Sequence, residues 1–421
     1  PMLAAVAEAP AVSLAGPLSE ALEAQVLVDD GDQLSFRHDL WREAVYGTIS
    51  PAIRAGIHVQ FGDHLRAGRH PAPHVAAHYL RGAEFGDAGA VEVLRSAAAE
   101  LGRVAPRTAT DLLERAVALL PEDHILHRAC LVELIQSCVF SGELARSEAL
   151  AEEQLAATLP QGAEFDLRNA RSQVFFLRGD AARAAEEFDA MVPLAVDAHR
   201  RAVLLADIAI SAMFSIDLDG ARAAAERSLE CAALVNDHTA PALAYGVLSW
   251  LAAFDGQLER ANDLADWAVT SADAGPGREG HRRIPHLFHS QVLLWADHVD
   301  EARRSLQRGR ALSEELGMGW DEPMYHALLA DERYRSGEWD DALAEAEAGL
   351  ERAAEVGSFF ADGWLYAHRA RVLFARGEYD GARRLLDRAD ERNPHADQGA
   401  DLRWFLRGLL AAHDRDSATA S

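Results

Sequence analysis

The sequence predicts an all-α fold of stacked helical hairpins, and three observations lead to that prediction. Short turn signals (SGEL, RGDA, DGQL, SGEW and RGEY) return at intervals close to 40 residues. Small residues occupy fixed positions on either side of each turn. Between the turns Ala, Leu, Glu and Arg dominate, with apolar residues three and four apart, which is the period of an amphipathic helix. Such hairpins bury their apolar faces against their neighbours, so they are expected to stack into a superhelix.

The repeat is defined by its turns and by two columns of small residues. The turn positions are Val104, Gly142, Gly179, Ile216, Gly256, Asp297, Gly337 and Gly377, which are 37–41 residues apart. Five residues after each turn stand Ala109, Ser147, Ala184, Ala221, Ala261, Ala302, Ala342 and Ala382. Seven residues before each turn stand Ala97, Ile135, Ser172, Ala209, Ser249, Ser290, Ala330 and Ala370, of which all but Ile135 are small. Because paired helices approach closely only where both contact positions are small, these columns predict about eight or more helical hairpins.

This pattern resembles the tetratricopeptide repeat. The family pattern of Gly, aromatic, Ala, Ala and Pro is met by Gly377, Tyr379, Ala382, Ala389 and Pro394. The period here is longer than the family's, which is about 34 residues. The additional residues are expected in helices or linkers, most clearly in the Gly- and Pro-rich stretch 271–285.

Residues 1–87 do not follow the repeat. A helix is predicted at 18–25, and two apolar runs flank Asp29-Asp30-Gly31-Asp32, which indicates a β-hairpin. Helices are predicted over 39–48, from Pro51 to about residue 66 and from Pro71 to about residue 82. A helix, a hairpin and a helix in this order form a winged-helix layout. We therefore predict the end of a winged-helix domain at 1–50, linking helices at 51–87, tetratricopeptide-like repeats at 88–395, and a capping helix with a frayed tail at 396–421.

A second resemblance covers the order of these parts. The runs LSFRHDLWREAVYGTI at 34–49, HVAAHYL at 74–80 and LLERAVALLP at 112–121 are similar to the large ATP-binding LuxR-type (LAL) regulators of actinobacteria, which belong to the signal-transducing nucleotide-switch ATPases. The resemblance implies the effector- or partner-sensing repeat region of a transcriptional regulator, non-catalytic by itself. It also implies that His38 contacts the β-phosphate of bound ADP in the full-length regulator only, although a histidine capping the next helix is an equal alternative. ATP or ADP is then expected only at an ATPase domain outside these residues, and no cofactor or metal within them.

The concave face of a superhelix is where such folds bind their partners. Groove-facing positions ten, six and three residues before the turns provide the candidate binding residues Asn169, Gln173, Trp250, Gln291, Asp331 and Tyr334. Amide, carboxylate and aromatic groups beside small residues suit a small-molecule effector, a peptide or a protein. The alternative for each aromatic residue is an ordinary place in the core between repeats.

Composition excludes several classes of function. With 41 Lys and Arg against 67 Asp and Glu, the net charge is −26, which disfavours contacts with nucleic acid and anionic membranes. All the basic residues are Arg, so a phosphate loop that requires Lys is impossible. Three cysteines form no metal or disulfide pattern, and no apolar run is long enough to span a bilayer.

Catalysis is not expected, since no nucleophile with a base and no paired carboxylates stand out. A cytoplasmic protein is expected, as a monomer or a weak homodimer, with Trp404, Phe405 and Leu409 forming an exposed apolar stripe on the last helix. The alternative function is a free-standing protein-binding tetratricopeptide scaffold.

Overall fold

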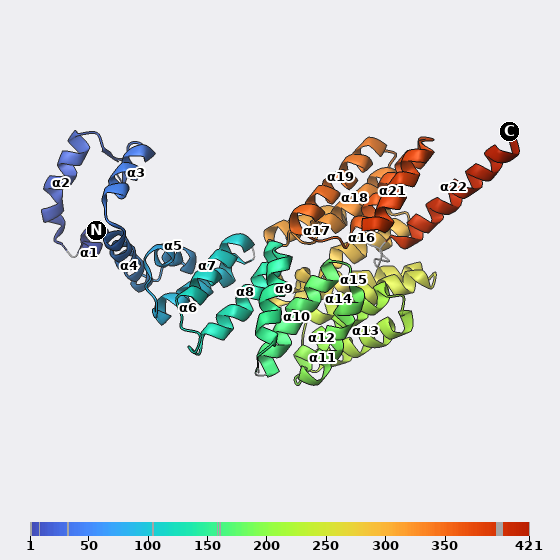
Figure 1. Ribbon diagram of the computed structural model, residues 1–421, viewed down its shortest axis with the longest axis horizontal. Helices are drawn as coiled ribbons and strands as arrows, with labels where there is room; N and C mark the ends of the chain where they lie inside the picture. The colour runs from blue at the N-terminus through green and yellow to red at the C-terminus, as the bar shows by residue number, and fades with distance from the viewer. Residues whose placement is uncertain are drawn as a thin grey trace. The chain divides into compact units, whose positions relative to one another are not determined.

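The computed structural model describes residues 2–7, 9–31, 33–102, 105–157, 159, 161–392 and 399–420. The chain divides into two compact units, residues 1–133 and residues 134–421 (Figure 1). The division falls within helix α8 (His127–Ser141), so predicted repeats occur in both units. Within the described residues, no helix is both long and apolar enough to cross a bilayer.

The first unit begins with short helices and one small hairpin. Helices α1 (Met2–Val6) and α2 (Ala11–Glu23) precede strands β1 (Leu27–Asp29) and β2 (Leu34–Phe36), which pair antiparallel with Leu27 opposite Phe36. The side chains of Asp29 and Asp30 accept hydrogen bonds from the backbone of Gly31 and Gln33 and so shape the turn. The predicted hairpin is therefore confirmed, whereas α2 begins earlier than predicted.

The three helices that follow the hairpin have nearly the predicted bounds. They are α3 (Asp39–Thr48), α4 (Pro51–Ala67) and α5 (Ala72–Gly82). Gly82 allows α4 and α5 to pack closely, because a Cβ at this position would lie 2.5 Å from the carbonyl oxygen of Ala55. The pair is also joined by a hydrogen bond of 2.7 Å from the Tyr79 hydroxyl to Asp63.

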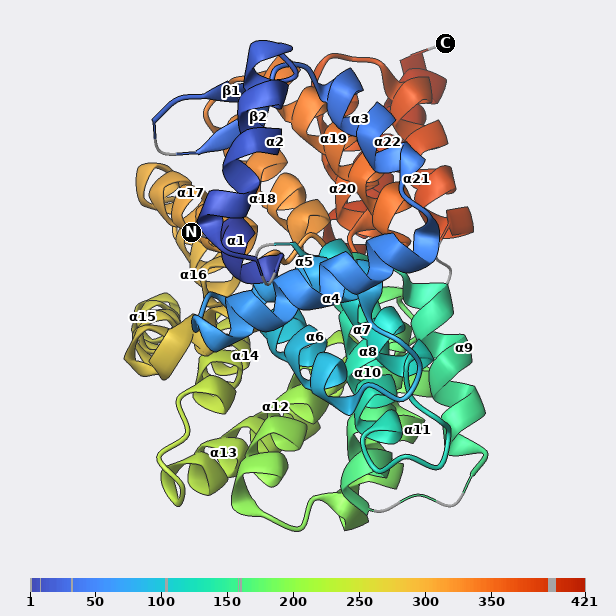
Figure 2. The same ribbon diagram turned by 90° about the vertical axis from the view of Figure 1, so that its left-hand side faces the viewer.

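Eight helical hairpins follow in the part of the chain that the structure describes (Figures 1 and 2). They are α6 (Ala88–Leu101) with α7 (Pro106–Ala118), α8 with α9 (Leu144–Leu155), α10 (Gln161–Leu177) with α11 (Ala181–Met191), α12 (Ala198–Phe214) with α13 (Leu218–Ala233), α14 (Thr239–Phe254) with α15 (Leu258–Ala274), α16 (Pro285–Trp295) with α17 (Val299–Glu315), α18 (Glu322–Arg335) with α19 (Trp339–Val356), and α20 (Asp362–Ala375) with α21 (Tyr379–Arg392). Helix α22 (Ala400–Ala420) packs against α20 and α21. The all-α, tetratricopeptide-like fold predicted from the sequence is confirmed.

The two columns of small residues lie at the helix contacts. None of the sixteen residues is more than 1% exposed. The serine hydroxyls of the columns are satisfied by backbone carbonyls, across the hairpin from Ser147 to Ile135 at 3.0 Å and within one helix from Ser290 to His286 at 2.6 Å. Close approach of the helices leaves no room for a larger side chain, which explains why the columns are visible in the sequence.

The turns also share one backbone conformation. All seven turn positions from Gly142 to Gly377 have a positive φ, and they include Ile216 at 62° and Asp297 at 61°. Val104 and Pro394, which belong to the repeat predicted from the sequence, lie outside the described residues. Glycine adopts this conformation without steric cost, which is why it recurs at these turns.

Two local predictions are wrong. The stretch 271–285 was expected to be a linker, but α15 continues to Ala274 and a 3₁₀ segment, η2 (Pro276–Arg283), covers most of the rest. This segment is held by His281, which is buried and lies 2.9 Å from Asp273. The tail after residue 414 was expected to fray, but α22 runs to Ala420, because no Gly or Pro follows Gly408 to end it.

The inner face of the second unit is bridged across its width. The loop between α19 and α20 reaches back to the end of α10, where Leu177 accepts backbone hydrogen bonds from Phe359 at 3.0 Å and Phe360 at 3.2 Å. The Ser358 hydroxyl bonds the same carbonyl at 3.2 Å. The repeat pattern predicted one concave binding face, but in the structure this inner face is divided at the loop between α19 and α20.

Candidate functional site

The larger of two hollows on this inner face is a cavity of about 570 Å³, here called the large cavity. Residues from α12, α14, α16, α18, α20 and α22 line it. They include Phe214, Ile216, Trp250, Phe254, Gln291, Trp295, Asp331, Arg335, Trp364, His368, Arg371, Trp404 and Phe405. This volume lies within the range of small-molecule and cofactor sites, which are mainly apolar with a few polar groups.

A compact charged cluster forms the polar part of this cavity. The carboxylate of Asp331 accepts hydrogen bonds from Arg371 at 2.6 Å and from Arg335 at 3.1 Å. Arg371 also donates to Nδ1 of His368 at 3.1 Å, and its guanidinium lies 3.8 Å from the centre of the Tyr334 ring. Two guanidinium groups thus share one buried carboxylate.

Burial and charge set the protonation of this cluster. Burial, assisted by the Arg371 guanidinium, lowers the pKa of His368 to about 3, so this ring is neutral at neutral pH. Burial by itself raises the pKa of Asp331, but the neighbouring positive charges outweigh it and hold that pKa below its usual value. Since His368 is neutral, the opposing charges are those of Arg371 and Arg335. The buried part of the cluster therefore places two guanidiniums around one carboxylate, while Asp297 lies 3.9 Å from Arg335 and Asp401 also lines the cavity.

Aromatic rings form a wall at one side of the large cavity. The Phe360 ring lies 5.0 Å from Phe214, which lines the large cavity, and 4.6 Å from Phe176, which lines the second hollow. Trp250 and Trp364 also pack around Phe214, at 6.1 and 6.4 Å. The backbone bonds of Phe359 and Phe360 to Leu177 hold this wall in place.

The structure separates the six predicted groove residues. Trp250, Gln291 and Asp331 line the large cavity, whereas Gln173 lines the second hollow. Tyr334 lies beneath Arg371 and stacks on Trp339. Asn169 lines neither hollow, although its buried Oδ1 has no hydrogen-bond partner among the described residues.

The sequence left two interpretations open for Trp250, a binding residue in the groove or a core residue between repeats, and its position in the structure fits both. Its ring lines the large cavity, yet it is only 3% exposed and its indole N–H donates to the carbonyl of Phe288 at 3.3 Å. His38 is the N-cap residue of α3, and its exposed side chain makes no capping hydrogen bond there. The capping alternative for His38 is therefore not realised by its side chain.

Several residues of the large cavity were not among the six predicted binding residues. Arg371 occupies a groove-facing position of the repeat, so its register was a usable signal. Arg335 and His368 lie outside that register, one turn of helix from Asp331 and Arg371 respectively. Trp404 and Phe405 were predicted to be exposed, and they are 64% and 61% exposed, but their place at the rim of a cavity was not foreseen.

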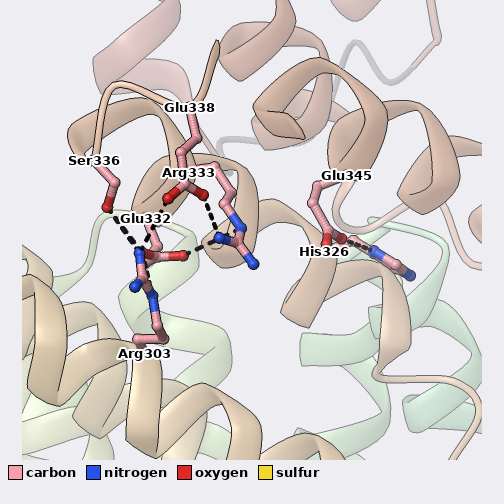
Figure 3. A network of polar contacts seen from close by, with 7 residues as sticks. All are labelled: Arg303, His326, Glu332, Arg333, Ser336, Glu338 and Glu345. Atoms are coloured by element: carbon pink, nitrogen blue, oxygen red, sulfur yellow. Dashed lines mark hydrogen bonds and ion pairs between the residues drawn. The ribbon is translucent and has the colours of Figure 1, made fainter. Parts of the chain in front are cut away.

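A second polar network fixes helix α18, which carries Asp331 (Figure 3). Glu332 is fully buried and accepts hydrogen bonds from Arg303 at 2.9 and 2.5 Å and from Ser336 at 3.0 Å. Arg333 bonds Glu338 at the start of α19. These contacts join α17, α18 and α19 and so hold Asp331 in position. Among the described residues, no group of three or more His, Cys, Asp or Glu side chains could hold a metal ion.

The second hollow, here called the small cavity, has a volume of about 260 Å³. It is lined by residues from α8, α10, α11, α12, α14, η2 and the loop before α18. They include Val139, Phe140, Gln173, Phe176, Asp207, Ile210, Thr239, Leu243, Arg283, Ile284 and Trp320. Its polar centre is one ion pair, in which Arg283 donates to Asp207 at 2.9 Å.

Comparisons with known proteins identify the fold. No family model matches the chain, and no curated protein matches it. A Rap protein complexed with competence and sporulation factor shares 15% identity over 79% of this chain and 99% of that one, with a TM-score of 0.50. A STAND protein with a tetratricopeptide repeat sensor from Pyrococcus horikoshii shares 13% identity over 97% of this chain, with a TM-score of 0.45. This chain spans 62% of the length of that protein. At these identities the likeness concerns the fold, which is that of tetratricopeptide-like helical repeats.

Proposed function

We propose that the second unit is a sensor that binds an anionic peptide or small-molecule effector in the large cavity, and that it serves a transcriptional regulator. The observation that carries the proposal is the pair of guanidiniums around one buried carboxylate. Arg371 and Arg335 both bond Asp331, and the Nε of Arg371 is buried without a partner among the described residues. A carboxylate on the ligand would accept from these guanidiniums and be stabilised by their charge.

The walls of the large cavity indicate which chemical groups the ligand carries besides its carboxylate. Trp295, Trp364, Trp404 and Phe405 offer aromatic surface around the charged cluster. Rigid aromatic side chains supply large contact areas at low entropic cost, so an apolar or aromatic body is favoured. A short peptide with an apolar C-terminal residue and a free carboxylate combines both features. The complex of a Rap protein with competence and sporulation factor supports the proposal, because that protein is similar in fold.

The regulatory part of the proposal rests on the sequence. The order of hairpin, helix, linking helices and repeats over the first 121 residues resembles the LAL regulators. In that setting the ligand would act by binding one state of the regulator more tightly than the other. We propose that these residues do not themselves catalyse a reaction or bind ATP. Saturable ATP binding in calorimetry, or ATP turnover, would contradict this part.

The ligand class is tested with matched peptides. N-acetylated pentapeptides that end in Leu or Phe are prepared with a free C-terminal carboxylate and as C-terminal amides. Tryptophan fluorescence and calorimetry report binding, and we expect the acids to bind at least tenfold more tightly. Equal affinities of acid and amide would contradict the proposal.

A matched pair of variants tests the role of the second guanidinium. Arg335→Gln leaves one Arg facing Asp331, so the preference for acids should fall below threefold. Arg376→Gln is the control, because Arg376 is equally exposed but bonds Asp340 outside the cavity. An unchanged preference in the Arg335 variant would show that the ligand carboxylate is bound elsewhere. Mass spectrometry of molecules that co-purify with the parent protein would then name the effector.

A further inference from the structure

The small cavity contains hydrogen-bonding groups that the protein itself does not satisfy. Arg283 uses Nη1 to bond Oδ1 of Asp207, but its Nε and Nη2 and the Oδ2 of Asp207 are buried with no partner among the described residues. Buried polar atoms are nearly always paired, so each exception calls for a partner such as a ligand, an ion or a water molecule. Two donors and one acceptor thus lie side by side in a mainly apolar cavity.

The surroundings of the ion pair are apolar and enclosing. Val139, Phe140, Phe176, Ile210, Leu243 and Trp320 line the cavity around it. Burial raises the pKa of Asp207, while Arg283 acts in the opposite direction, so the carboxylate is poorly solvated where it stands. A ligand N–H that bonds Oδ2 would replace the missing solvation.

The backbone next to the ion pair is strained. Ile284 follows Arg283 directly, is buried, lines the cavity and has a φ of 49°. The left-handed region is unfavourable for a β-branched residue, and such strain occurs preferentially at ligand sites. This conformation turns the chain from η2 into α16 at the point where Arg283 faces Asp207.

We propose that the small cavity is a second ligand site, for a neutral molecule that carries an amide on an apolar body. The carbonyl oxygen of the amide accepts from Nη2 or Nε of Arg283, and its N–H donates to Oδ2 of Asp207. The guanidinium of Arg282, which also lines the cavity, lies 5.0 Å from the centre of the Phe140 ring and donates to the carbonyl of Leu316. Within the ion pair itself one Arg and one Asp balance in charge, so an anion there would compete with Asp207 and a cation with Arg283. Gln173 and Thr239 provide further polar contacts at the cavity wall. This site shares no lining residue with the large cavity and does not depend on its function.

Three probes of similar size test the proposed class. Acetanilide carries an amide on an aromatic ring, benzoate carries a negative charge, and propylbenzene has neither. Ligand-observed NMR titrations of the full chain should show saturable binding of acetanilide, at least tenfold tighter than that of benzoate or propylbenzene. Absence of saturable acetanilide binding, or a preference for benzoate, would overturn the proposal.

Variants assign the binding to this cavity. Ile210→Trp fills the cavity and should reduce acetanilide affinity at least tenfold. The double variant Asp207→Leu/Arg283→Met replaces the ion pair by apolar groups of similar size, which proteins generally tolerate, and should invert the preference toward propylbenzene. Trp404→Ala, at the rim of the large cavity, should leave acetanilide binding unchanged. Thermal unfolding verifies that each variant is folded. Undiminished acetanilide binding in both small-cavity variants would overturn the proposal, whatever the peptides do in the large cavity.

Discussion

The two cavities of the second unit are built from the same parts in different proportions. Each has mainly apolar walls, and each contains an aspartate paired with arginine. In the large cavity Arg371 and Arg335 share Asp331, whereas in the small cavity Arg283 alone pairs with Asp207. The wall around Phe360 lies between them.

We propose that the number of arginines bonded to each aspartate sets the class of ligand that each cavity binds. Two guanidiniums hold the pKa of Asp331 below its usual value, and the buried Nε of Arg371 is left as a donor for an anion. One guanidinium does not offset the burial of Asp207, whose pKa is raised, and the balanced pair favours a neutral ligand. Burial acts alike in both places, so the charge count makes the difference.

The largest expected effect comes from removing the aromatic wall around Phe360 that lies between the two cavities. Phe360 is only 2% exposed, so Phe360→Ala should lower the free energy of unfolding by about 3–5 kcal/mol through lost burial and a new cavity. Urea denaturation followed by circular dichroism measures the loss. Phe254→Ala is the control, because Phe254 lines the large cavity but is half exposed, and it should cost less than about 1 kcal/mol. Equal costs for the two variants would show that the wall is not a packed part of the fold.

The second prediction concerns the dependence of stability on pH. His368 has a pKa of about 3 in the folded protein against a usual value of 6.5, so the unfolded chain binds the additional proton between these values. Its contribution to stability is complete above pH 6.5 and is lost as the pH falls toward 3, at up to about 1.4 kcal/mol per pH unit. The lowered pKa of Asp331 acts in the same direction at lower pH.

His368→Gln isolates this contribution, because glutamine offers Arg371 an acceptor but does not titrate. Between pH 6.5 and 4 the wild type should lose about 3 kcal/mol more than the variant. His286, whose pKa burial lowers to about 4, contributes to both proteins and cancels in the difference. Parallel stability curves for the two proteins would contradict the burial of a neutral imidazole at this position. Asp207 in the small cavity changes stability with pH in the opposite direction. A carboxyl group whose pKa is raised by folding contributes stability that is lost as the pH rises through that pKa.

The hairpins could be predicted from the sequence because their determinants are local. A turn glycine and two small residues such as Ala330 and Ala342 lie within twelve residues of one another, and their contact repeats with the chain. The hairpin between β1 and β2 was equally local. Each of these features depends only on two helices or two strands that follow one another in the chain.

The cavities could not be predicted because they depend on how the hairpins curve. The wall requires Phe360 to meet Leu177, and no periodicity relates positions so far apart in the chain. The register placed Asn169 and Gln173 in one groove with Asp331, but the wall separates Gln173 from Asp331. His368 and Arg335 were missed because a cluster built across helices has no signature within one repeat.

The third prediction tests the open rim of the large cavity. Trp404 is mostly exposed, so Trp404→Ala should change the free energy of unfolding by less than about 0.5 kcal/mol. It should nevertheless weaken binding of the peptide acids about tenfold, because the indole offers contact area to the ligand. Trp267→Ala is the matched control, since Trp267 is 53% exposed on α15 and does not line the cavity. Equal affinities of the two variants, measured by calorimetry, would exclude the rim from the binding surface.

The smallest predicted effect concerns a strained residue at the same rim. Ile216 holds a turn position that is glycine in five of the seven described turns, it has a φ of 62°, and its side chain is exposed at the large cavity. A left-handed β-branched residue is costly, so Ile216→Gly should stabilise the fold by about 0.5–1 kcal/mol after the greater chain entropy of glycine is counted. The same variant should weaken binding of the peptide acids, because the rim loses apolar surface. Asn236→Gly is the control at the turn between α13 and α14, where φ is 53° and neither cavity is lined. It should stabilise by less, because asparagine tolerates this conformation better, and it should leave binding unchanged. Stabilisation by Ile216→Gly without any loss of affinity would show that this isoleucine is not retained for the ligand.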